Sequence, residues 1–326
     1  MEWTADVSAG DWLRERIDDP WRGTMHDVVP RGFAAYARVF HPSSVQGIPG
    51  ERMPSLAAWR EMDWQQHEPL MARIQERPAR WSEAADAFGT VFHPTAQWDR
   101  LVRAGDRGAQ VESADGRWWN APMDGTLPSD TVPVLAEHLA AHTSAPHDGY
   151  VALWEGHGGL VGHLGVGPSR TFFQPGDPHD PALQRHNEML GRSVRDVWNN
   201  VFRKSTWQDG LLSREISEGP RFALPGRSHV LFRGGVADLA RPDWVLHVPW
   251  RDRIAEGHGF DPAAISPGIL WPDDRAWVLV TDVDHDSTIV GGPAELVAAL
   301  VADPRLEAVE VAEGIALTDD ADEINR

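Results

Sequence analysis

Residues 276–311, AWVLVTDVDHDSTIVGGPAELVAALVADPRLEAVEV, predict the fold more clearly than any other stretch of the chain. Apolar residues dominate 276–283 and predict a buried strand. Two glycines and Pro293 precede a helix that we expect over 294–302, because proline fits the first turn of a helix. A further strand is expected over 306–311. The C-terminal part of the chain is therefore predicted to combine strands with a helix.

The rest of the chain mixes the same two kinds of element. Apolar residues at i, i+3, i+4 and i+7 predict a helix over 131–142, and residues 54–104 have large apolar anchors at broadly helical spacing. Short strands are expected at 28–33, 34–40, 150–154, 222–224, 229–232 and 244–248, and a longer helix through Leu183, Leu190, Val194, Val197 and Val201. Because strands and helices do not alternate regularly, we predict an α+β fold with mixed or antiparallel sheets and flanking helices.

The length of 326 residues suggests about two domains at roughly 150 residues each. The polar, glycine-bearing stretch 105–116 is typical of a linker or a hairpin. We therefore expect an N-terminal mixed, largely helical region over 1–104 and a C-terminal α+β region over 117–326, forming one compact unit or two tightly packed domains. The polar residues 319–326 are expected to fray.

Charge and composition exclude several classes of protein. Lys and Arg total 30 against 49 Asp and Glu, a net charge of −19, and Lys204 is the only lysine. Such a chain repels phosphate backbones, so we expect no nucleic-acid partner, and anionic membrane surfaces are disfavoured for the same reason. The absence of cysteine excludes disulfides, cysteine-ligated metals and thiol catalysis. The expected partner is a protein or a small molecule of unknown identity.

Two features of the sequence bear on where the protein acts. The first residues, MEWTAD, are acidic and polar and do not have the pattern of a signal peptide. No apolar run approaches the ~20 residues that a membrane-spanning helix needs. We therefore expect a cytoplasmic protein without a membrane partner.

Alternating aspartates at Asp282, Asp284 and Asp286 are the first candidate site, because carboxylates suit hard cations. They open like a calcium loop, but Ser287 stands at loop position six and Pro293 at position twelve, so an EF-hand is excluded. In a strand the three carboxylates would share one face and could hold Mg²⁺ or Mn²⁺. The alternative is a strand end with solvated aspartates and a turn.

Three further sets of residues are candidates. His138 and His142 lie at i, i+4 on the predicted helix, a spacing that can bind Zn²⁺, although packed structural histidines are the alternative. Asp273, Asp274 and Arg275 form either a turn or a carboxylate–guanidinium binding pair. Among sixteen tryptophans, the pair Trp118 and Trp119 could form an exposed recognition patch, whereas most of the others are expected in the core.

Two long segments resemble a known family. VVPRGFAAYARVFHP at 28–42 and the segment 270–292 resemble the VVPRGFxAYARVxHP opening and the WPDDRAW…STxVGG closing motif of a family of uncharacterised actinobacterial proteins. The resemblance extends to 81–85, 153–156 and 224–227. In the closing motif the family pattern has a glutamate where Asp282 stands. The family has no assigned activity, so the resemblance implies no functional residue.

Two hypotheses about function follow. The first is a non-catalytic binding or interaction protein, because no complete catalytic motif is present and the chain is acidic and rich in tryptophan. The alternative is a metal-assisted hydrolase, in which the carboxylates of Asp282, Asp284 and Asp286 would hold Mg²⁺, Mn²⁺ or Zn²⁺.

Overall fold

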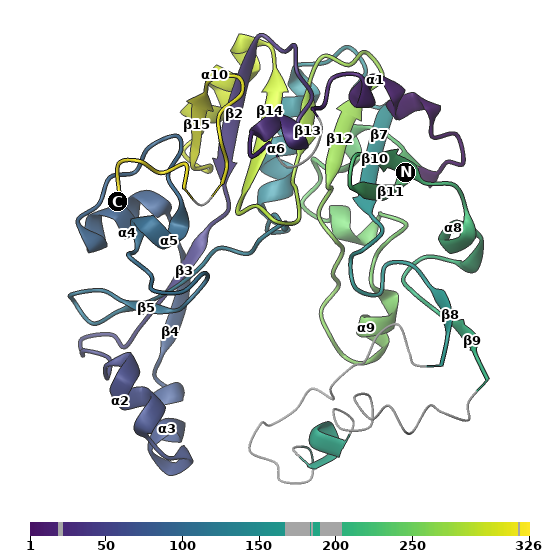
Figure 1. Ribbon diagram of the computed structural model, residues 1–326. Coiled ribbons are helices and arrows are strands. Elements are labelled where there is room, and N and C mark those ends of the chain that lie inside the picture. Colours follow the sequence, from purple (N-terminus) through teal and green to yellow (C-terminus); the bar gives the residue numbers. More distant parts are fainter. Residues whose placement is uncertain (19–21, 167–182, 184, 190–203, 319) are drawn as a thin grey trace.

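A large antiparallel sheet dominates the computed structural model, which describes residues 1–18, 22–166, 183, 185–189, 204–318 and 320–326 (Figure 1). Its strand order is β1-β11-β7-β12-β13-β14-β2-β15, with β10 added beside β11. The strands are β1 (Glu2–Trp3), β2 (Ala35–Phe40), β7 (Gly149–Trp154), β10 (Phe222–Leu224), β11 (Arg227–Arg233), β12 (Ile269–Pro272), β13 (Val278–Val280), β14 (Ser287–Gly292) and β15 (Ala308–Val311).

Both faces of this sheet are covered, which explains why its central strands are apolar. Successive side chains on a strand point to opposite faces. Leu279 therefore packs into a core formed with α6 (Thr131–Ala141) and α10 (Ala294–Ala302), whereas Val278 and Val280 pack into a second core on the other side. That second core contains Trp12 and Leu13 of α1 (Asp11–Arg14).

A smaller sheet has the order β4-β3-β6-β5. The chain leaves β2 at Phe40 and enters β3 at Ser43, so one short crossing joins the two sheets (Figure 1). The strands are β3 (Ser43–Gly47), β4 (Gln75–Ala79), β5 (Val111–Glu112) and β6 (Trp118–Asn120), and the helices between them are α2 (Leu56–Glu61), α3 (Trp64–Met71), α4 (Trp81–Phe88) and α5 (Trp98–Leu101). In Figure 1, α2 and α3 extend away from the large sheet.

The remaining elements are short. They are β8 (His163–Gly165), paired with β9 (Thr206–Gln208), the helices α8 (Arg214–Glu218) and α9 (Arg253–Gly257), and the 3-10 turns η1 (Ser8–Gly10), η2 (Met25–Asp27), η4 (Val236–Asp238) and η5 (Trp244–Leu246). None of the helices in the described ranges is long and apolar enough to cross a membrane.

The predicted α+β class is confirmed, and α6, α10 and β15 lie where the sequence predicts them. The strand expected over 276–283 is shorter than predicted, because the chain turns at 281–286 and returns as β14. The strands expected at 28–33 and 244–248 are wrong. The first segment is turn and coil and the second is largely η5, so both apolar runs fill the core without joining a sheet.

In both sheets, strands that precede the stretch 105–116 in the sequence pair with strands that follow it. In the large sheet β2 pairs with β14 and β15, and in the small sheet β3 pairs with β6. The stretch itself contains β5 and the start of a hairpin, since the Ser113 N–H donates to the Arg117 carbonyl at 2.9 Å. Most of the helix expected through Leu183 and Val201 lies outside the described residues.

Candidate functional site

A pocket opens beside the turn between β13 and β14, and residues of α5 and of the loop after β6 also line it. Its volume is about 260 Å³. We call it the acidic pocket, because carboxylates from three separate segments line it. They belong to Asp99 of α5, Asp124 of the loop after β6, and Asp284 and Asp286 of the turn; Gln97, Trp98, Arg100, Arg107 and His285 are among the other lining residues.

Gly125 brings the loop of Asp124 against the turn. Its N–H donates to the carbonyl of His285 at 2.8 Å, and its φ of +63° is one that L side chains rarely adopt. A Cβ at this position would lie 2.4 Å from the Cα of Val283. Only glycine lets the two backbones approach so closely. The side chain of Asp124 consequently faces the same cavity as Asp284 and Asp286.

Arg38 holds Asp286, one of the pocket carboxylates, in position. It is a fully buried arginine of β2, and its Nη2 lies 3.2 Å from Oδ1 of Asp286. Nε donates to Oγ of Ser287 at 2.8 Å, and Nη1 donates to the carbonyls of Pro94 at 3.1 Å and Ala96 at 2.9 Å. A buried guanidinium is tolerated only when its donors are satisfied, as they are here. The network fixes Asp286 and the segment that leads to α5.

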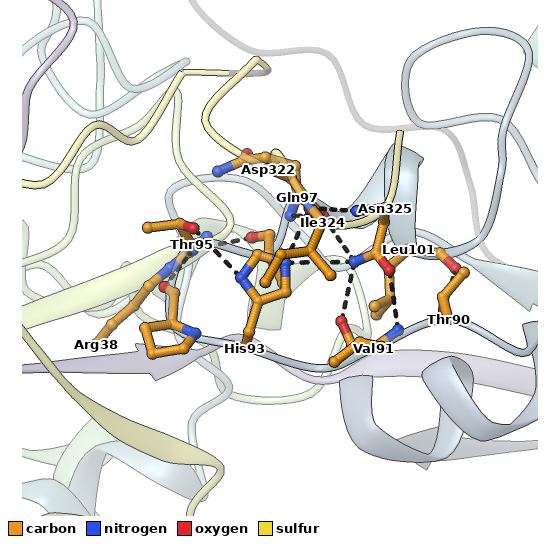
Figure 2. A network of polar contacts seen from close by, with 12 residues as sticks. Arg38, Thr90, Val91, His93, Thr95, Gln97, Leu101, Asp322, Ile324 and Asn325 are labelled. Atoms are coloured by element: carbon orange, nitrogen blue, oxygen red, sulfur yellow. Dashed lines mark hydrogen bonds and ion pairs between the residues drawn. The ribbon is translucent and has the colours of Figure 1, made fainter.

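The C-terminal tail holds the pocket residue Gln97 and the segment before it in place (Figure 2). The fully buried carboxylate of Asp322 lies 2.8 Å from Nε2 of His93 and accepts from the N–H of Gln97 at 3.3 Å. The side-chain oxygen of Asn325 accepts from the N–H of Val91 at 2.9 Å, and its amide nitrogen donates to the Val91 carbonyl at 2.9 Å. The expectation that residues 319–326 fray is therefore wrong for this part of the tail, because buried polar groups tie it down.

The electrostatics of the acidic pocket favour a positive charge. Burial raises the pKa of the Asp124 carboxyl above its usual value, and the negative charges of Asp286 and Asp284 raise it further. Arg107 and His285 oppose this rise without cancelling it. The ionised form of Asp124 is therefore disfavoured, and a cation placed beside it would favour that form.

Two buried nitrogens at the pocket wall have no hydrogen-bond partner among the described residues. They are Nε2 of Gln97 and Nε1 of Trp98, whose side chains are almost completely buried. A buried donor left without an acceptor costs about 1–3 kcal/mol. Both residues line the acidic pocket, but neither of these nitrogens is accessible to solvent, so each is enclosed within the wall behind the cavity.

The three predicted metal ligands do not converge. Residues 281–286 form a turn and not a strand, so the carboxylates do not share one face. Asp282 and Asp284 both pair with Arg227, whose Nε lies 2.9 Å from Oδ2 of Asp282, whereas Asp286 pairs with Arg38. Across the described part of the chain, no group of three or more His, Asp or Glu side chains is arranged to hold a metal ion.

His138 and His142 are both engaged in contacts within the fold. Nε2 of His138 lies 2.7 Å from Oδ2 of Asp303, and Nδ1 of His142 lies 2.8 Å from the carbonyl of His138. The first contact joins α6 to the end of α10, and the second closes the end of α6. These contacts support the structural alternative for both histidines.

The Asp273–Arg275 segment forms a turn rather than a converging binding pair. Asp274 accepts from the Thr143 and Ser144 hydroxyls at 2.8 and 2.7 Å, which joins the turn to the end of α6. Asp273 lies 3.7 Å from Arg233, and the guanidinium of Arg275 lies 5.5 Å from the ring centroid of Trp12.

The proposed recognition patch at Trp118 and Trp119 is wrong, because both side chains are buried. β6 lies between β3 and β5, and its two faces are covered by different cores. Nε1 of Trp118 donates to the Pro54 carbonyl at 3.1 Å, and Nε1 of Trp119 to Oγ of Ser113 at 3.0 Å. Their adjacency reflects a strand that is buried on both faces.

Sequence reasoning missed Asp124, Gln97, Arg38 and the His93–Asp322 pair. One signal was present: Arg38 is a lone charge inside the otherwise apolar segment 35–40. A charge in a buried strand needs a partner, and such a pair often belongs to a polar site. Nothing in the local sequence indicates that Asp124 and Asp286 meet.

Comparison with protein-family models, with curated proteins and with solved structures finds no match. The assignment of a function therefore rests on the geometry of the acidic pocket.

Proposed function

We propose that the protein is a non-catalytic binding protein, and that its ligand is a small organic cation held in the acidic pocket. The observation that carries this proposal is the carboxylate of Asp124, which lies 3.7 Å from Nη2 of Arg107, has a raised pKa, and shares a cavity with Asp284 and Asp286. A bound cation would stabilise the ionised form of Asp124 and relieve the repulsion among these carboxylates.

The volume of the pocket sets a second requirement. It is about 260 Å³, just below the range of roughly 300–1,000 Å³ that is usual for drug-sized ligands. An amino acid ester or amide has this size and carries a positive charge.

Isothermal titration calorimetry at low ionic strength tests the proposal, with L-arginine methyl ester and L-lysine methyl ester as probes. We expect at least one ester to bind, and Asp124→Asn to weaken that binding at least tenfold. Asp238→Asn is the matched control, because Asp238 is similarly exposed and has a similar 3.7 Å contact to a cation, the N-terminal amine, far from the pocket. Equal loss in both variants, or no binding by the wild type, would refute the proposal.

The metal-assisted hydrolase has weaker support, because Asp282, Asp284 and Asp286 are divided between two arginines. Elemental analysis of protein purified without a nickel column or chelator separates the two proposals. A near-stoichiometric divalent ion that is lost in Asp284→Ala, with the fold retained, would favour the hydrolase over the binding protein.

A further inference from the structure

A hydroxyl, an imidazole and a carboxylate form one chain of contacts beside the C-terminal tail (Figure 2). Oγ1 of Thr95 lies 3.2 Å from Nδ1 of His93, and Nε2 of His93 lies 2.8 Å from Oδ1 of Asp322. His93 and Asp322 are buried, whereas Thr95 is partly exposed. Thr95 is therefore the member of this chain that is open to solvent.

The hydrogen bonds of Asp322 decide which nitrogen of His93 carries the proton. The backbone N–H groups of Ile324 and Asn325 donate to Oδ1 of Asp322 at 3.1 and 2.9 Å. A carboxylate surrounded by N–H donors stays ionised, and an ionised carboxylate can only accept hydrogen bonds. Nε2 of His93 therefore carries the hydrogen. Nδ1 of the neutral ring is left with the lone pair that accepts from the Thr95 hydroxyl.

The turn that carries Thr95 is held on both sides. The N–H of Ala96 donates to the carbonyl of His93 at 3.0 Å, which closes a turn with Pro94 at its second position, where proline is favoured. Nη1 of the buried Arg38 donates to the carbonyls of Pro94 and Ala96, on either side of the hydroxyl. Because both neighbours of Thr95 are fixed, the contact between hydroxyl and imidazole is formed before a reactant arrives.

We propose that Thr95 is an acyl-acceptor site, at which the hydroxyl takes an acyl group from an activated carboxylic ester. Oγ1 attacks the carbonyl carbon of the ester while Nδ1 of His93 takes the hydroxyl proton. The bond from that carbon to the leaving oxygen then breaks, and the proton passes from His93 to the leaving group. The products are an acyl ester on Thr95 and a free alcohol or phenol.

His93 is the general base in this step, and Asp322 is a positioning residue that fixes the tautomer of the imidazole. The inference goes beyond the proposed function, because Thr95, His93 and Asp322 do not line the acidic pocket. A single acyl transfer to the protein requires no turnover, so it is compatible with a non-catalytic binding protein.

Treatment of the native protein with p-nitrophenyl acetate tests the site, and peptide mass spectrometry locates the stable acetyl esters. Thr143 is the internal control, because it is also partly exposed and its hydroxyl donates directly to the Asp274 carboxylate at 2.8 Å. General base catalysis by a side chain contributes roughly 10²–10⁴-fold, so Thr95 should be acetylated at least about tenfold faster than Thr143. Equal or slower acetylation of Thr95 would overturn the proposal.

His93→Gln removes the base and keeps the Thr95 hydroxyl, and the glutamine amide can still donate to Asp322. Acetylation of Thr95 should fall to the rate of Thr143, whereas the rate at Thr143 should not change. A preference for Thr95 that survives in this variant would overturn the proposal. If circular dichroism shows that the variant does not fold, the comparison of Thr95 with Thr143 in the wild type still decides.

Nitrogen-15 NMR of the imidazole provides a readout that a purely structural role of Asp322 would not require. The wild type should show His93 as the neutral tautomer with the hydrogen on Nε2, and Asp322→Asn should lose this single tautomer and acetylate Thr95 more slowly. A hydrogen on Nδ1 of neutral His93 in the wild type would overturn the proposal, because that nitrogen could not take the hydroxyl proton.

Discussion

Oδ1 of Asp322 lies 2.8 Å from Nε2 of His93, although 229 residues separate them in the sequence (Figure 2). Both side chains are buried, and Oδ2 of the same carboxylate accepts from the backbone of Gln97, which lines the acidic pocket. The C-terminal tail is therefore part of the wall of the candidate site.

Asp322→Ala should release the tail and destabilise the fold. The substitution leaves His93 and the N–H of Gln97 without their buried acceptor, which costs about 1–3 kcal/mol or more. Urea denaturation should show this loss, and amide exchange should increase over 320–326. Asp320→Ala is the control, because Asp320 is exposed and accepts a side-chain hydrogen bond from Thr318 in the same tail. Equal exchange in both variants would contradict the role of Asp322.

The Asp322 carboxylate should also contribute to the pH dependence of stability. Burial alone would raise its pKa, but the hydrogen bonds from Asn325, His93 and Gln97 outweigh burial and hold the pKa below the usual value of 3.8. A depressed folded-state pKa stabilises the native state above pH ~4, and this stabilisation is lost as the pH falls further. Asp322→Asn should therefore flatten the stability profile below pH 4, measured by urea denaturation.

His229 should make the fold sensitive to mild acid. Burial lowers the pKa of its imidazole to about 4, so the unfolded chain binds a proton at a higher pH than the native protein does. The native state then loses stability as the pH falls from about 6.5 towards 4, by about 2 kcal/mol between pH 7.5 and 5. His229→Leu should remove this slope, whatever its effect on stability at pH 7.5. Parallel profiles for the two proteins would contradict this assignment.

Gly125→Ala should lower the stability of the fold and also disturb the acidic pocket. The left-handed conformation costs a non-glycine residue about 1–2 kcal/mol, and the overlap with Val283 adds about 1–3 kcal/mol. Gly89→Ala is the control, because Gly89 has a φ of +64° and open space around it. The two variants should differ in thermal stability, and only Gly125→Ala should weaken binding of the arginine ester.

Arg38 should be far more important for stability than a surface arginine. Arg38→Met leaves Asp286 and two backbone carbonyls without their donor, and breaking a buried pair costs about 3–5 kcal/mol. Arg38→Lys keeps the charge but lacks the fork, so an intermediate loss is expected. Guanidinium denaturation measures both, and a Lys variant as unstable as the Met variant would show that charge contributes little.

Trp119→Ala tests the corrected position of the tryptophan pair. Deleting a fully buried tryptophan should cost about 3–5 kcal/mol. Trp64 of α3 is 46% exposed, so Trp64→Ala should change stability by about 0.5 kcal/mol or less. Similar losses in chemical denaturation would contradict the difference in burial.

Local sequence patterns were sufficient to predict several elements. The apolar stripe of α6, the proline before α10 and the alternation along β2 all predict structures that form, because each pattern reports which face of a local element is buried. The same patterns fail for 28–33 and 244–248, where apolar residues enter the core from turns. Apolar composition predicts burial in both segments but does not distinguish a strand from a turn.

The sequence by itself determined the α+β class, the strong negative charge and the absence of cysteine chemistry, because composition and local periodicity are properties of the chain alone. Tertiary structure alone decided which carboxylates meet. Asp282 and Asp286 are four residues apart yet pair with different arginines, while Asp124 and Asp286 come from distant segments and line the same pocket. Which of these side chains come together depends on strand pairing between distant segments and on the close backbone contact at Gly125. Local sequence encodes neither.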